Sequence, residues 1–144
     1  MTLGFFPPRI RTIDEALDFL PFWAEVIGGE QRDGLVISQV RDSNDVVIGI
    51  RVKKFHIDFS IFDAVLTVGM RFDANLVADL YTFDLRTRDG RLLWREDNHP
   101  GHEHQHDGPH HLHIGPEENH RAPASPVSLE MIATKVVATF INLR

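Results

Sequence analysis

The chain has 144 residues, of which 42% are hydrophobic and 25% charged. This length and composition predict a single globular domain over residues 1–144 and exclude disorder along the whole length. It has no cysteine, no run of about 18 apolar residues and no basic start followed by an apolar run, which predicts a cytoplasmic protein without disulfides, thiolate metal sites or membrane spans. The net charge of −6 argues against a broad basic surface for nucleic acid, although it leaves room for a local basic patch.

The first predicted element is a helix that begins near Thr12. Thr12 and Glu15 fit a capping box, in which the two side chains satisfy backbone N–H groups of the first turn. Four apolar residues then recur on roughly one face: Ile13, Leu17, Leu20 and Trp23. Pro21 predicts a kink or the start of a second short helix, and Gly28 with Gly29 predicts the stop.

An alternating pattern rich in β-branched and aromatic residues follows the helix. It predicts an antiparallel meander of about five strands, over residues 35–40, 46–59, 65–72, 77–86 and 91–96. Polar turn signals occur at residues 42–45 and 88–90.

The second of these strands changes parity in its middle. Its apolar residues are first Ile48, Ile50 and Val52, and then Phe55, Ile57 and Phe59. One extra residue in a strand sends every later side chain to the opposite face, so we expect a bulge at Lys53 and Lys54.

The last predicted element is a helix capped by Ser128 or Ser125. Its apolar residues recur at helical spacing: Leu129, Ile132, Val136 and Phe140. The complete layout is a helix, a meander, a histidine-rich loop over residues 99–120 and a C-terminal helix packed on the sheet. This layout is an α+β domain.

Eight of the nine histidines lie between His99 and His120, and histidine can transfer protons or bind a transition metal near neutral pH. In an extended backbone His102, His104 and His106 share one side, where they could hold zinc, nickel or copper. The alternative is a solvated surface loop, which the glycines and the proline of this segment favour.

The second half of the histidine segment has a recognisable context. After Tyr81 the sequence reads DLRTRDGRLLWREDN, later PHHLH, and then SPVSLEMIATKV. The distinctive residues are Arg95, Asp97, Asn98, Pro109, His110, His111, His113, Ser128 and Leu129. This order of strand, Asp-Gly turn, R-x-D-N strand end, P-H-H-x-H segment and Ser-Leu helix start resembles the TumE family of bacterial toxin components.

The resemblance covers roughly the C-terminal half, and two features depart from it: the extra histidines at 102, 104 and 106, and the helix from Thr12. It implies a cytoplasmic toxin that a protein antitoxin holds inactive, with RNA as a candidate target. It implies no particular reaction.

Metal-independent RNA cleavage needs a group that takes the 2′-hydroxyl proton, a group that protonates the leaving oxygen and a cation for the developing charge. His110, His111, His113 and Arg95 are groups of these types. In an extended segment His111 and His113 share one side and His110 faces the other.

We therefore assign the acid-base pair to His111 and His113, the phosphate ligand to Arg95 and the orientation of an imidazole to Asp97. Asn98 would hold the loop through an Asx turn or donate to the substrate. This hypothesis, an endoribonuclease, requires no cofactor.

Structural interpretations compete with these roles. Arg95 and Asp97 could form an ion pair at a strand end, with Asn98 as a turn residue. We expect His56 to be an ordinary sheet residue, and we expect Tyr81 and Trp94 to pack in the core rather than stack on bases.

Two other functions fit the sequence. One is a metal-binding or metal-sensing module, in which His102, His104 and His106 join a later histidine around zinc or nickel. The other is an interaction domain without catalysis, and a homo-oligomer is compatible with each alternative.

Overall fold

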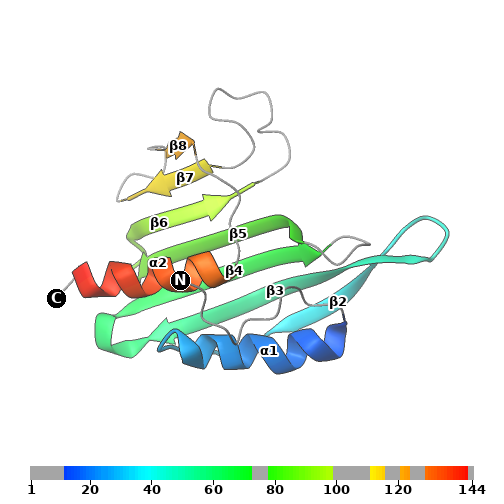
Figure 1. Cartoon of the computed structure of the whole chain (residues 1–144), viewed down its shortest axis with the longest axis horizontal. Coiled ribbons are helices and arrows are strands. Elements are labelled where there is room, and N and C mark those ends of the chain that lie inside the picture. The colour runs from blue at the N-terminus through cyan, green and yellow to red at the C-terminus, as the bar shows by residue number, and fades with distance from the viewer. Residues whose placement is uncertain (1–11, 73–77, 99–110, 116–120, 124–128, 143–144) are drawn as a thin grey trace.

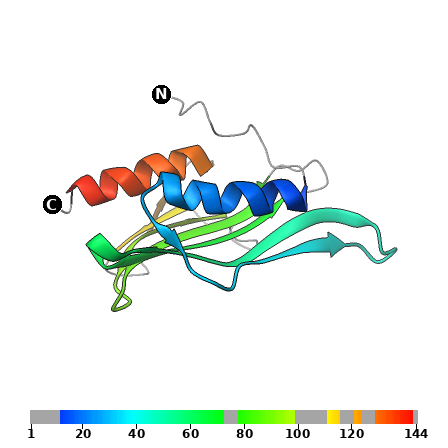
Figure 2. The same ribbon diagram turned by 90° about the horizontal axis from the view of Figure 1, so that it is seen from below.

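The structure is a computed structural model that describes residues 12–72, 78–98, 111–115, 121–123 and 129–142. An antiparallel sheet carries two helices, α1 (Ile13–Val26) and α2 (Leu129–Asn142), on one of its faces (Figures 1 and 2). This arrangement confirms the predicted α+β class. None of the described helices has the length and apolar character needed to span a membrane.

The described part of the sheet has eight strands, and β3 pairs with β2 along one half and with β1 along the other. From β3 the order continues through β4, β5, β6, β7 and β8. The strands are β1 (Glu30–Gln31), β2 (Val36–Arg41), β3 (Val47–Phe59), β4 (Ala64–Phe72), β5 (Ala78–Thr87), β6 (Leu92–Asp97), β7 (His111–Ile114) and β8 (Arg121–Pro123). A short 3-10 helix, Ser60–Phe62, joins β3 to β4.

Strands β2 to β6 confirm the five-strand meander, with ends within two residues of those predicted. The bulge is also confirmed, because the β3–β4 register shifts between Val52 and Phe55. Lys54 takes the left-handed conformation there, with φ of 57°. The parity change therefore keeps both halves of β3 buried on the same side.

Three short strands lie outside the prediction. β1 has only two residues, too few for a visible alternation. β7 occupies part of the segment predicted as a loop and pairs with β6, and β8 follows directly after that segment. The histidine-rich loop is therefore wrong for residues 111–114, which belong to the sheet.

Helix α1 begins as predicted, with Thr12 Oγ1 accepting a hydrogen bond from the Glu15 N–H at 3.0 Å. It continues through Pro21 as one helix from Ile13 to Val26, so of the two predicted alternatives at Pro21 the start of a second short helix is wrong. Gly28, with φ of 86°, follows its end. Of the predicted apolar face, Leu20 and Trp23 are buried and Leu17 is exposed.

The core lies between the sheet and the two helices. Trp23 of α1 donates its indole N–H to the Leu129 carbonyl at 3.3 Å, and Trp94 donates to Thr139 Oγ1 at 3.0 Å. Ile132, Val136 and Phe140 of α2 are buried, as their spacing predicts. These contacts confirm that α2 packs on the sheet.

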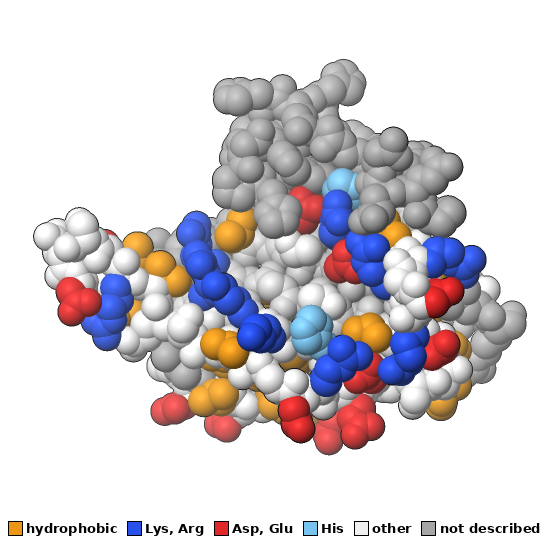
Figure 3. Space-filling model, turned by 180° about the vertical axis from the view of Figure 1, so that it is seen from behind, with side chains coloured by type: hydrophobic (Ala, Val, Ile, Leu, Met, Phe, Trp, Pro, Cys, Tyr) orange, Lys and Arg blue, Asp and Glu red, His pale blue; other side chains and the backbone are white. Residues whose placement is uncertain are grey.

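Because side chains alternate along a strand, the residues between the core positions face away from the helices. In β5 the core residues are Tyr81, Phe83 and Leu85, and in β6 they include Leu92 and Trp94. The expectation that Tyr81 and Trp94 pack in the core is confirmed. We call the opposite side of the sheet the polar face; charged side chains gather there (Figure 3).

Candidate functional site

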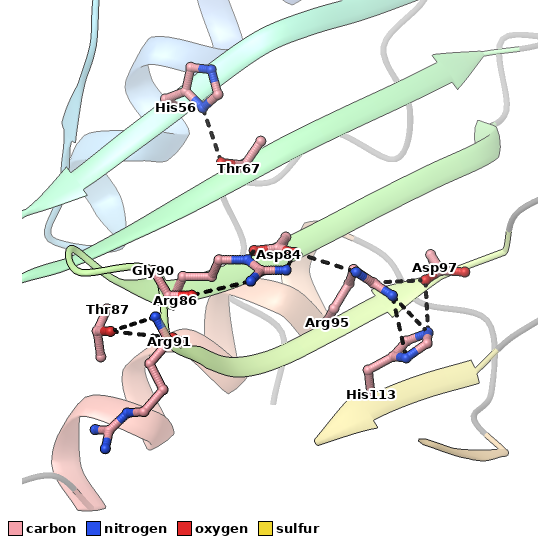
Figure 4. A network of polar contacts seen from close by, with 10 residues as sticks. All are labelled: His56, Thr67, Asp84, Arg86, Thr87, Gly90, Arg91, Arg95, Asp97 and His113. Atoms are coloured by element: carbon pink, nitrogen blue, oxygen red, sulfur yellow. Dashed lines mark hydrogen bonds and ion pairs between the residues drawn. The ribbon is translucent and has the colours of Figure 1, made fainter. Parts of the chain in front are cut away.

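A row of polar residues crosses the polar face from β3 to β7, one from each strand. Each member is the register partner of the next: His56, Thr67, Asp84, Arg95 and His113. Figure 4 shows their side chains along the sheet. The row reaches β7 where β7 pairs with β6, at the candidate site that the sequence predicted, and the register partner of His113 on β8 is Arg121.

Arg95, Asp97 and His113 form the trio at that end of the row. His113 Nε2 lies 3.3 Å from Asp97 Oδ2, and Arg95 Nε lies 3.3 Å from the same oxygen. Arg95 Nη2 lies 3.4 Å from each ring nitrogen of His113. Three of the predicted catalytic residues are thus in mutual contact.

The local sequence explains why these residues meet. Trp94 and Glu96 point toward the helices, so the alternate residues of β6, Arg95 and Asp97, point to the polar face. The register then places His113 directly opposite Arg95. A slip of one residue in β7 would remove this contact.

The trio is largely withdrawn from solvent. Asp97 is 1% exposed and His113 is 5% exposed, whereas the Arg95 side chain keeps 25% of its surface exposed. A buried carboxylate needs compensating partners, and here a guanidinium and an imidazole supply them. Arg95 is therefore the member of the trio that is most available to a ligand.

Asp84 and Arg86 of β5 extend the trio along the polar face. Arg86 holds the Asp84 carboxylate with both Nε and Nη2, at 2.8 and 3.1 Å, and Arg95 Nη1 lies 3.9 Å from Asp84 Oδ2. Sequence reasoning missed both residues. Their alternation with Phe83 and Leu85 was visible, but only the register shows that Asp84 lies opposite Arg95.

Asn98 closes the end of the β5–β6 pair. Its side-chain oxygen accepts a hydrogen bond from the Tyr81 N–H at 2.7 Å, and its own N–H donates to the Tyr81 carbonyl at 3.3 Å. These contacts give Asn98 a structural role beyond that of a turn residue. They do not place it against a substrate.

Other predicted residues fall outside this geometry. His56 hydrogen-bonds Thr67 across β3 and β4 at 3.0 Å, in agreement with an ordinary sheet residue. His111 pairs in register with Asp97, but its side chain lies outside the described part of the structure, and His110 lies outside it altogether.

The proposed metal ligands His102, His104 and His106 also lie outside the described residues. Among the residues that the structure does describe, no three His, Cys, Asp or Glu side chains are grouped to hold a metal ion. The zinc or nickel alternative therefore stays a prediction.

An exposed ion pair borders the row near His56. Arg32 donates from Nε and Nη2 to the two carboxylate oxygens of Asp58, at 3.1 and 2.7 Å. The hydrogen bonds from Arg32 lower the pKa of Asp58 below its ordinary value, against a smaller opposing effect of burial. This carboxylate thus stays charged at neutral pH.

Two helices on one face of an antiparallel sheet, with a charged trio on the other face, define the protein as a small α+β domain with a polar sheet face. Residues 32–142 match the family described as Toxin TumE, and the chain therefore belongs to the TumE family. Its members are toxin components of toxin–antitoxin systems, whose partners are antitoxins. Searches of curated proteins and of solved structures gave no match.

The family match is wider than the resemblance seen in the sequence. It begins just after α1 and includes the whole meander as well as the C-terminal helix. Helix α1 lies outside the matched residues, as the sequence comparison indicated.

Proposed function

We propose that this toxin is a cytoplasmic endoribonuclease whose site is built around the trio of Arg95, Asp97 and His113. The observation that supports the proposal is the closed set of contacts among these side chains on the polar face. A cation, an imidazole and an orienting carboxylate are the groups that cleavage of a phosphodiester uses.

In the proposed reaction the RNA 2′-oxygen attacks the adjacent phosphorus while a base takes the 2′-hydroxyl proton. The bond from phosphorus to the 5′-oxygen breaks, and an acid protonates that oxygen. The products are a 2′,3′-cyclic phosphate and a free 5′-hydroxyl. Arg95 would neutralise the charge that develops on the phosphate.

The contacts of His113 suggest how its ring would act. If Asp97 accepts a hydrogen bond from Nε2–H, the neutral ring keeps its lone pair on Nδ1, which faces Arg95 Nη2 at 3.4 Å. Nδ1 would take a proton once the guanidinium turns from the ring to the phosphate. The second acid-base group in this proposal is His111 or, from the other side of the segment, His110. Asn98 serves the site by fixing the end of β6.

The low exposure of His113 also fits a positioning role. In that role the imidazole and Asp97 hold the Arg95 guanidinium in place, and His111 or His110 transfers the protons. A pH profile separates the two roles. Loss of an acid-base group removes one limb of the rate profile, whereas loss of a positioning residue lowers the whole profile.

The test is toxicity and RNA cleavage by Arg95→Gln and His113→Gln. His56→Gln is the matched control, because it changes a hydrogen-bonded histidine of the same row far from the trio. We expect the two site variants to lose about 10²-fold or more in cleavage rate and to relieve growth arrest. Circular dichroism and thermal unfolding establish that each variant is folded.

Unchanged toxicity in folded Arg95→Gln and His113→Gln would remove the trio from the proposal. Cleavage is measured with a chelator present, and the cyclic phosphate is identified by mass spectrometry. Activity that disappears on chelation and returns with zinc or nickel would instead favour metal chemistry at the predicted histidines.

A further inference from the structure

The polar face carries a second group of cations away from the trio. Arg51 of β3 and Arg71 of β4 are direct register partners. Their chain neighbours Ile50, Val52 and Met70 are buried on the helix side, so alternation places both arginines on the polar face. Neither side chain is fully buried.

Lys53 extends this group along β3. It lies at the bulge, where Lys53 and Lys54 together face a single residue of β4, Gly69. A Cβ added to Gly69 would meet no atom within 4 Å, so the space beside Lys53 is open. We call Arg51, Lys53 and Arg71 the basic patch.

The basic patch concentrates positive charge on a small part of the sheet. Like charges directly opposite each other on a sheet destabilise the strand pair. In the part of the chain that the structure describes, neither Arg51 nor Lys53 forms an ion pair with a carboxylate, in contrast to Arg32 and Arg86. Figure 3 shows Lys and Arg side chains in a diagonal band on this face, in a chain of net charge −6.

We propose that the basic patch binds the phosphate backbone of RNA and leads the strand to Arg95. The inference rests on the proposed function, because it takes RNA as the polyanion. RNA phosphates would supply negative charge beside Arg51 and Lys53, for which the described part of the chain supplies no carboxylate partner, and Arg71 lies directly opposite Arg51.

The sheet geometry fits one strand that touches both places. Arg71 is opposite Leu80 and Arg95 is opposite Asp84, four residues further along β5. The backbones of Arg71 and Arg95 are therefore about 13 Å apart along the strands and about 10 Å apart across them. A short stretch of RNA can span that diagonal.

The polar face also indicates how RNA would be read. Tyr81, Phe83 and Trp94 all pack on the helix side of the sheet. Among the described strand side chains, none on the polar face is a Phe, Tyr or Trp that could stack on a base. Binding should therefore depend on phosphates, tolerate different sequences and weaken steeply with salt.

The test measures binding of a fluorescein-labelled 2′-O-methyl oligoribonucleotide of about 12 residues by anisotropy over a range of salt concentrations. The 2′-O-methyl group removes the attacking hydroxyl, so binding is measured without cleavage. Arg51→Gln/Arg71→Gln is compared with Arg91→Gln, which removes a charge at the exposed β5–β6 turn.

Each phosphate contact contributes about 0.7 to the slope of log affinity against log salt for a single strand, so the double variant should lose about 1.4. Arg91→Gln should keep the wild-type slope. The double variant should unfold at a temperature close to that of wild type, because both side chains are partly exposed on the polar face. A lower unfolding temperature in the double variant would show that the two arginines stabilise the fold, and would contradict their role in binding.

An unchanged salt slope in the double variant would contradict the proposal that the basic patch binds RNA. An equal loss of slope in Arg91→Gln would also contradict it. If the protein bound polyglutamate more tightly than RNA of equal charge, the ligand of the basic patch would be an acidic protein segment, and the RNA proposal would be wrong. The two proposals fail separately. RNA binding that needs the patch can occur without cleavage, and cleavage that depends on Arg95 can survive loss of the patch.

Discussion

The carboxylate of Asp97 reaches His113 diagonally from β6 to β7, since in this strand pair His113 is opposite Arg95 and Asp97 is opposite His111. The diagonal contact closes a triangle, in which each side chain of the trio touches the other two. Diagonal neighbours on a sheet are within reach of long side chains. The trio is therefore a coupled unit.

This coupling should be measurable as a double-mutant cycle. Asp97→Asn and His113→Gln each disturb the buried pair and should each lower the free energy of unfolding by about 2 kcal/mol. The double variant should lose less than the sum by at least about 1 kcal/mol in urea unfolding. Additive losses would show that the two side chains do not interact.

The role of Asn98 is testable by a conservative change. Asn98→Asp keeps an oxygen that can accept from the Tyr81 N–H, whereas Asn98→Ala leaves that donor unpaired and should cost about 1 kcal/mol of unfolding free energy. We expect Asn98→Asp to keep its toxicity. Full stability with lost toxicity in that variant would contradict our structural assignment and favour an amide donor to the substrate.

Gly115 controls the docking of β7 on β6. Its N–H donates to the Leu93 carbonyl at 3.0 Å, and a Cβ at this position would overlap the Leu92 carbonyl oxygen. Gly115→Ala should lower the unfolding free energy by about 2 kcal/mol and reduce toxicity by displacing His113. Gly69→Ala, whose Cβ has open space, is the control and should change neither quantity.

Acid stability should depend on Asp58. Its pKa is lower in the folded protein than in the unfolded chain, mainly because Arg32 donates to it. The resulting stabilisation is present above the unfolded pKa and is lost as the pH falls through the folded pKa. Asp58→Asn should therefore shrink the fall in unfolding temperature between about pH 6 and about pH 3.

Salt provides the matching control, because both partners are partly exposed and their attraction is screened. The difference between wild type and Asp58→Asn should narrow as salt is added. An identical pH response of the two proteins would show that the pair contributes nothing.

The fold was predictable because hydrophobic periodicity determines it. The parity change in β3 located the bulge at Lys53 and Lys54, and alternation in β4 to β6 located the strands. β7 could not be predicted in the same way, because its four residues lie in a segment dominated by histidine and only Leu112 and Ile114 of them are apolar. Pairing with β6, not local pattern, makes it a strand.

The site was predictable in its residue types and only partly in its geometry. The short segment R-x-D-N placed Arg95 and Asp97 on one face, but their contact with His113 depends on register between strands far apart in the sequence. The same limitation hid Asp84. Glu96 was hidden too: it occupies a core position beside Lys135, with 3.4 Å between its Oε2 and the Lys135 Nζ.

The row across the polar face takes one residue from each of five strands, and His113 is its last member in chain order. A ribosome makes Arg95 and Asp97 before it makes His113. Because synthesis runs from the N-terminus, a nascent chain that has reached only β6 has an incomplete trio. Under the proposed function the toxin becomes active only after β7 has paired with β6. An antitoxin that binds before this pairing step therefore binds the toxin before it is active.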